Sequence, residues 1–165
     1  MYTSILFKKF LIFGFTLLVL QVSAQTNNSK VRLQNFPSLA TPKGYSHAAV
    51  IDLGWANMII FSGQVPLDKN GNLVAKGNFK KQTEQVFENI KSALTDLGGN
   101  MSDVIKIGIY LTDMKNIQLF RNVRDKYIDV KNPPASTLVQ VSKLYRDEVL
   151  LEVEATAIIP KNTFK

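Results

Sequence analysis

One amphipathic stripe in the middle of the chain constrains the fold most. Between residues 79 and 97, apolar side chains recur at the three- and four-residue spacing of one helix face. Asn78 precedes this segment as a capping residue, and Gly98-Gly99 follows it with the backbone freedom that a helix end requires. The pattern predicts a helix that must bury one face against another layer.

Short apolar runs on both sides of this segment indicate strands. Residues 45–53 are β-branched and apolar, and residues 58–63 are almost continuously apolar, as in a strand buried on both faces. Residues 65–74 resemble a hairpin around Asn70-Gly71. Residues 104–111 alternate strictly. The alternation places on one face Ile105, Ile107, Ile109 and Leu111.

A second helix and two further strands complete the pattern. The helix is expected from about residue 115 to residue 130, where residues 121–127 form its exposed side, and Pro133-Pro134 ends it. Strands are expected at residues 137–141 and 149–159. This order predicts an α+β sandwich, with a mixed sheet and two helices on one face. The other face carries polar side chains and suits subunit packing with polar clefts: Lys106, Tyr110, Gln140, Glu152 and Glu154.

The two ends of the chain differ in character from this domain. Residues 1–24 combine a basic start, a short apolar run and a small-x-small site, the pattern of a secretory signal peptide. The run is shorter than the roughly 20 apolar residues of a membrane span. We therefore expect a periplasmic or secreted protein without a stable membrane anchor. Residues 25–43 suggest a flexible arm with at most a short turn, residues 44–160 the domain, and residues 161–165 a tail.

Composition excludes several classes of site. The net charge of +7 is spread along the chain without a basic block, so a nucleic-acid surface is not expected. The chain has no cysteine and one histidine, His47, which argues against a metal site. No nucleophile elbow, phosphate-binding loop or dinucleotide fingerprint is present, so the sequence offers no motif for these kinds of site.

A few polar residues remain as candidates for chemistry. Glu152 and Glu154 share one face of a strand, where carboxylates either carry out acid–base chemistry or form ordinary ion pairs. Gly63 follows a buried strand, and either lets a ligand approach the backbone or simply ends the strand. Ser136 and Thr137 place two neutral hydroxyls at the start of another strand.

Several stretches, taken together, resemble the reactive intermediate deaminase family, also called Rid or YjgF-like. In order and spacing they are GYSHA, FSGQVPLDKNGNLV, QTEQVFENIKSAL, VIKIGIYLTDM, PPAST and LEVEATA, and they cover about residues 44 to 160. The resemblance implies a chorismate mutase-like fold and a homotrimer with ligand-binding clefts at the subunit interfaces. It also implies hydrolysis of enamines and imines, such as 2-imino acids, to 2-oxo acids and ammonia without a metal or an organic cofactor.

The resemblance also assigns roles to individual residues. Glu152 matches the glutamate that positions the attacking water in the family. Tyr45 and Tyr110 match aromatic residues of the family's ligand site. Ser62 and Gly63 match its serine–glycine turn, which offers backbone and side-chain contacts to the ligand.

One family residue is missing. The family's carboxylate-clamping arginine stands in P-A-R-S/T, and here Ser136 takes its place before Thr137. Because arginine makes two parallel charge-assisted hydrogen bonds to a carboxylate, its loss typically costs about 2–5 kcal/mol. Lys106, Lys143 and Arg146 are the candidates for a substitute cation.

Three functions follow from the sequence. The first is an imine deaminase-like hydrolase with altered or reduced activity. The second is a trimer that binds a small molecule in its subunit clefts without catalysis. The third is an endoribonuclease, an activity also attributed to some family members. It is the weakest of the three, because the sequence shows no stripe of basic and aromatic residues that would bind RNA.

Overall fold

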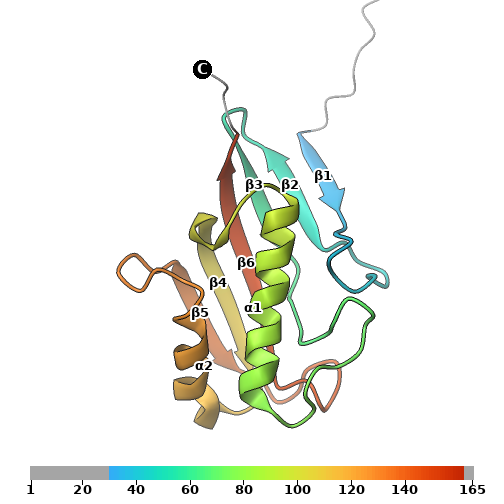
Figure 1. Cartoon of the computed structure of the whole chain (residues 1–165), viewed down its shortest axis with the longest axis vertical. Coiled ribbons are helices and arrows are strands. Elements are labelled where there is room, and N and C mark those ends of the chain that lie inside the picture. The colour runs from blue at the N-terminus through green and yellow to red at the C-terminus, as the bar shows by residue number, and fades with distance from the viewer. Residues whose placement is uncertain (1–29, 162–165) are drawn as a thin grey trace, which may run out of the picture.

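A computed structural model describes residues 30–161 as one mixed sheet with two helices on a single face (Figure 1). The strand order is β1-β2-β3-β6-β4-β5, and only β4 and β5 pair in parallel. The α+β sandwich expected from the sequence is confirmed. Its elements are β1 (Val31–Gln34), β2 (Ala48–Asp52), β3 (Ala56–Phe61), α1 (Phe79–Asp96), β4 (Val104–Leu111), α2 (Ile117–Arg124), β5 (Ala135–Gln140) and β6 (Leu151–Pro160).

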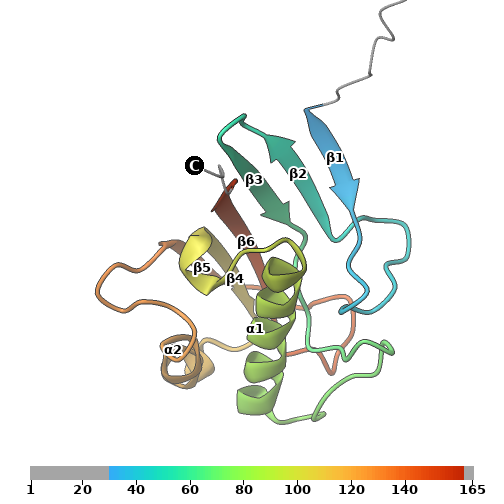
Figure 2. The ribbon, with the colours of Figure 1, turned by 45° about the horizontal axis from the view of Figure 1, so that its top comes forward.

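The helix α1 forms as its sequence predicts. The side chain of Asn78 accepts a hydrogen bond from the backbone N–H of Lys81 at 3.0 Å and so caps the helix. Gly98, at φ +76°, ends it. The apolar stripe is buried between the helix and the sheet from Phe79 to Leu94, and Leu97 is partly buried against the same core. Phe87 also packs on Phe120 of α2, with ring centroids 6.0 Å apart. Both views show α1 and α2 on the same side of the sheet (Figure 2).

Strand β6 separates the two faces of the sheet. Its odd-numbered residues from Leu151 to Ile159 are buried beneath the helices, whereas its even-numbered residues from Glu152 to Ile158 are only partly buried. This period of two is that of a strand with one face in the core. The second face, which no helix covers, therefore presents both glutamates.

The alternation expected for β4 is wrong at its first residues. The register of β4 against β6 shifts between Val104 and Lys106, which face Ala157 and Thr156 respectively. A bulge of this kind inserts one residue and turns the side chains before it to the other face. Val104 is therefore buried, and Ile105, expected in the core, is 48% exposed.

The expected arm at residues 25–43 is also more ordered than its composition suggests, in the part that the structure describes. Val31–Gln34 form the edge strand β1, which pairs with β2, and Phe36 and Leu39 are buried in the core. His47 holds this segment. Its Nδ1 accepts the N–H of Phe36 at 3.0 Å, and its Nε2 lies 2.8 Å from a backbone carbonyl oxygen of the same segment.

Other boundaries differ by a few residues. The second helix ends at Arg124 rather than near residue 130, because the chain continues as turns up to Pro133-Pro134. Residues 1–29 and 162–165 lie outside the described residues, and so do the expected signal peptide and most of the expected tail. Within residues 30–161, no helix is long and apolar enough to cross a membrane.

Candidate functional site

The centre of the candidate site is a pair of glutamates on the uncovered face of the sheet. Glu152 lies opposite Tyr110 across the β4–β6 pair, and Glu154 lies opposite Gly108. Gly108 leaves room for its neighbour, because a Cβ added there would lie 2.7 Å from Cγ of Glu154. The carboxylates of Glu152 and Glu154 on β6 and the phenol of Tyr110 on β4 thus lie next to one another on the uncovered face.

The serine–glycine turn after β3 places backbone against Glu152. The backbones of Gln64 and Val153 exchange two hydrogen bonds, of 2.8 and 3.0 Å, and this pairing brings the turn onto β6. A Cβ added at Gly63 would overlap the carboxylate of Glu152 and would lie 2.6 Å from its Cδ. Only glycine fits there without displacing the carboxylate.

Ser62 links the same turn to the segment that carries Tyr45. Its Oγ donates to the carbonyl oxygen of Ser46 at 2.7 Å, and its N–H donates to the carbonyl oxygen of His47 at 2.9 Å. The side chain of Tyr45 is 52% exposed and follows this anchored backbone. Ser62 therefore positions Tyr45, and its hydroxyl oxygen can still accept a hydrogen bond from a ligand.

The electrostatics of this cluster raise the pKa of Glu152 and of two tyrosines. Burial raises the pKa of Glu152 above the usual glutamate value, and the negative charge of Glu154 raises it further. Glu154 is also the main cause that raises the pKa of Tyr110. Burial, Tyr145 and Glu152, in that order, raise the pKa of Tyr45. Glu152 is thus a carboxylate of increased basicity, surrounded by two tyrosines and a second acid.

Tyr145 is a member of this cluster that the sequence did not indicate. It is 59% exposed in the loop between β5 and β6, and its charge helps to raise the pKa of Tyr45. The segment has no periodic pattern and no motif that would have pointed to the site.

The two hydroxyls at the start of β5 point to different faces. Thr137 is in register with Gly108 and so shares the uncovered face with Glu154. Ser136 is in register with Ile107 of the core, on the helix side, where it lines a cavity beside α2. The structure therefore gathers Tyr45, Ser62, Gly63, Tyr110 and Thr137 on the side of Glu152, whereas Ser136 of the same chain lies on the other side.

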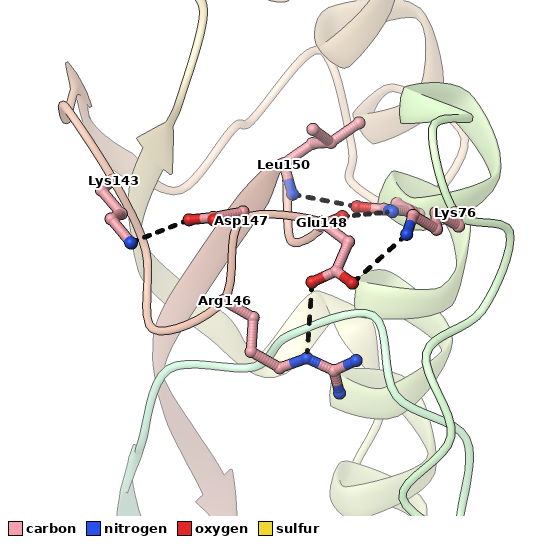
Figure 3. Close-up of polar contacts among 7 residues, drawn as sticks. Lys76, Lys143, Arg146, Asp147, Glu148 and Leu150 are labelled. Carbon is pink, nitrogen blue, oxygen red and sulfur yellow. Dashed lines mark hydrogen bonds and ion pairs between the residues drawn. The ribbon is translucent and has the colours of Figure 1, made fainter.

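The candidates for a substitute cation are mostly engaged elsewhere. Lys143 pairs with Asp147 at 2.9 Å, and Arg146 lies 3.8 Å from Glu148, in the loop drawn in Figure 3. Lys106 is exposed on the uncovered face, and among the described residues it has no carboxylate within 4.0 Å. None of the three forms an ion pair with Glu152 in this chain.

His47 does not contribute to this site through metal binding. Its ring is 2% exposed and both nitrogens contact backbone groups, so its role is to hold the N-terminal segment. In the part of the chain that the structure describes, no three His, Asp or Glu side chains are grouped so as to hold a metal ion.

Comparison with known proteins agrees with this geometry. The family model described as Endoribonuclease L-PSP matches residues 37–159. The chain belongs to this family. A RutC family protein of Pyrococcus abyssi is 39% identical over 101 residues, which are 61% of this chain and 78% of that protein. The resemblance to Rid and YjgF-like proteins seen in the sequence is thereby confirmed.

Solved structures of the family share the fold. A putative endoribonuclease of Thermotoga maritima matches with a TM-score of 0.69 and 32% identity, over 79% of this chain and 98% of that chain. TdcF of E. coli, crystallised with bound serine, matches with a TM-score of 0.64 and 26% identity, over 76% of this chain and 96% of that chain. The chorismate mutase-like Rid fold expected for this chain is therefore confirmed.

Proposed function

We propose that this Rid-family protein hydrolyses reactive imines or enamines to oxo compounds and ammonia, with Glu152 as the residue that aligns and deprotonates water. The observation that carries the proposal is the position of Glu152, half-buried over Gly63 with a raised pKa. A general base works best when its pKa lies near the working pH, and burial moves this carboxylate in that direction.

The reaction needs only groups that this site can supply. Water attacks the carbon of the C=N bond as one of its protons passes to the carboxylate of Glu152, which delivers that proton to the nitrogen to give a carbinolamine. The carbinolamine hydroxyl then gives its proton to Glu152, which passes it to the amino nitrogen. The C–N bond breaks, ammonia leaves, and the carbon keeps the oxygen as C=O. Tyr45, whose raised pKa keeps it protonated, can donate a hydrogen bond to the ligand throughout, whereas the hydroxyl of Tyr110 is directed to Glu154.

A small polar ligand suits this site. The serine bound to TdcF is a small amino acid held by a protein of the same fold. We place the corresponding ligand of this chain over Gly63, between the uncovered face of one subunit and a neighbouring subunit, in the trimer that the family resemblance implies. A polar, partly buried sheet face without a covering helix is suited to such packing.

A second candidate is ligand binding without chemistry. It is favoured by Ser136, which replaces the residue that clamps the substrate carboxylate in the family. The family is also described as an endoribonuclease. The sequence has no stripe of basic and aromatic residues, which argues against RNA binding.

The decisive experiment is imine hydrolysis by the wild-type protein. 2-Iminopropanoate is generated from alanine by an amino-acid oxidase in the presence of semicarbazide, which traps the imine as it forms. Hydrolysis by the protein should lower semicarbazone formation in proportion to its concentration, and heat-denatured protein should have no effect. Binding of pyruvate without hydrolysis of the imine would support the second candidate, ligand binding without catalysis. Cleavage of a single-stranded RNA by a well-folded sample would support the endoribonuclease.

We also propose that residues 1–24 direct export and are removed. N-terminal sequencing of the protein recovered from its native cells should begin at Gln25, in the periplasmic or extracellular fraction. Recovery of the intact N-terminus from the cytoplasm would contradict export.

A further inference from the structure

A partly open cavity lies on the helix side of the sheet. Its volume is about 360 Å³, and it is bordered by β4, β5, α2 and the turns between α2 and β5. Its apolar wall includes Ile107 and Ile128, and its polar groups are Ser136, Arg124 and Asp125. A concave space that combines apolar side chains with a few convergent polar groups is suited to a small molecule.

Arg124 is held in this cavity with part of its hydrogen-bonding capacity unused. Its Nε and Nη2 donate to the same oxygen of Asp125, at 2.9 and 2.7 Å, and 24% of its side chain is exposed. A guanidinium group has five N–H donors. Within residues 30–161, the remaining three have no partner. The pair with Asp125 therefore fixes the guanidinium while leaving donors for an anion.

Ser136 and Arg124 line one cavity, although they are 12 positions apart in the sequence. The small side chain of Ser136 leaves space at the position where the family resemblance expects an arginine. Arg124 brings a guanidinium to the same space from α2. The sequence pattern had left this residue on the exposed side of a helix, without a role.

We propose that this cavity is a carboxylate-binding subsite, in which Arg124 clamps the carboxylate of a small 2-oxo or 2-imino acid and replaces the arginine missing at Ser136. The identity of the ligand rests on the proposed function, whereas the anion-binding role of Arg124 does not. The planar fork of arginine suits a carboxylate, and the apolar wall suits a short aliphatic chain. Because Ser136 and Glu152 lie on opposite faces of one chain, a ligand that meets both binds between subunits.

The test is the affinity of the purified protein for pyruvate, measured by isothermal titration calorimetry. Arg124→Gln should weaken binding about 10- to 100-fold, because it removes the charged partner of the carboxylate. Asp125→Asn should strengthen binding, because it removes a competing negative charge and releases two N–H donors. Arg121→Gln is the matched control, since Arg121 is exposed on the same helix and does not line the cavity, and it should leave affinity unchanged.

The two variants distinguish a carboxylate clamp from a structural role, because a clamp predicts that Arg124→Gln weakens pyruvate binding and that Asp125→Asn strengthens it. If Arg124 only stabilised α2, Arg124→Gln and Asp125→Asn would both lower the melting temperature and would change affinity in the same direction. Ser136→Arg, introduced into Arg124→Gln, should restore pyruvate binding by returning the guanidinium from β5.

Two results would overturn the proposal: no pyruvate binding by the wild type, or binding that is indifferent to Arg124→Gln. Failure of the proposed function looks different, because pyruvate would then bind in an Arg124-dependent way without imine hydrolysis. If Arg124→Gln hydrolysed the imine as fast as the wild type, the proposed hydrolase function would be retained and the carboxylate-binding role of Arg124 would be refuted.

Discussion

The carboxylate of Glu152 occupies the space that a side chain at position 63 would fill. The backbone pairing of Gln64 with Val153 fixes this approach, because it joins the turn after β3 to the residue that follows Glu152. Gly63 is therefore required by its neighbour, and its backbone φ is not in the left-handed region. The role of Gly63 is to let the turn and the carboxylate form one surface.

Gly63→Ala should displace Glu152 and reduce imine hydrolysis about 100-fold, since a shift of roughly 1 Å in a catalytic group has an effect of this order. The fold should persist, because alanine can adopt the backbone conformation at this position. The measurement is kcat/KM for 2-iminopropanoate, with circular dichroism as the check of folding.

Gly108→Ala is the matched control for this change. It crowds Glu154 in the same way, with Cγ 2.7 Å from the added Cβ, but it leaves the carboxylate of Glu152 in place. Its effect on kcat/KM should be much smaller. Equal losses in the two variants would show that crowding of the sheet face, rather than the position of Glu152, determines activity.

The acidic limb of the pH–rate profile should depend on Glu154. Activity falls as pH falls through the pKa of Glu152, because a protonated carboxyl group cannot accept the proton of water. Glu154→Gln removes a like charge that raises this pKa, so the limb should move to lower pH. Burial is the larger cause of the raised pKa of Glu152 and remains in the variant, so the midpoint of the acidic limb should stay above the ordinary glutamate pKa. Glu84→Gln, on the outer side of α1, should not move it.

Glu152→Gln should stabilise the protein at neutral pH. A raised pKa in the folded state means that the folded protein binds this proton more tightly than the unfolded chain does. The stabilising contribution is full below the unfolded-state pKa and is lost as pH rises through the folded-state pKa. The variant has no such loss, so its advantage in the free energy of unfolding should grow from about pH 4 to about pH 7 in urea titrations. An advantage that shrinks with rising pH would contradict the direction of the shift.

His47→Ala should destabilise the whole domain. It leaves the buried N–H of Phe36 and the partly buried carbonyl of Ala40 without their partner, and it opens space beside the stacked ring of Phe36. The expected loss in the free energy of unfolding is about 2–4 kcal/mol, measured by urea denaturation. Ser38→Ala, which removes an exposed hydrogen bond of the same segment, should lose less than about 1 kcal/mol.

Local patterns predicted the parts of the fold that are determined locally. The helix α1 was predicted because its cap, its apolar stripe and its terminal glycine all act within one segment. Strand β1 was missed because the alternation of Val31–Gln34 is only four residues long and lies in an otherwise polar segment with two prolines. Its stability comes from pairing with β2 and from the burial of Phe36 and Leu39. The bulge in β4 was missed because it depends on the register with β6.

The candidate site shows the same limit. Family resemblance indicated Glu152 and Gly63, and the structure shows why they belong together. Tyr145 lies in an irregular loop, and its electrostatic effect on Tyr45 depends on the path of that loop. Arg124 was assigned to a solvent-exposed helix face, because the sequence does not show that the turns before β5 enclose it.

The most direct test of the account compares imine hydrolysis by the wild type and by Glu152→Gln at neutral pH, with 2-iminopropanoate generated in situ. Glutamine keeps the size of the side chain and removes its ability to accept a proton. The account predicts that the wild type hydrolyses the imine and that the variant loses at least about 100-fold in kcat/KM, while remaining folded and no less stable. A variant that retains wild-type activity would remove Glu152 from the mechanism and contradict the proposed function of this site.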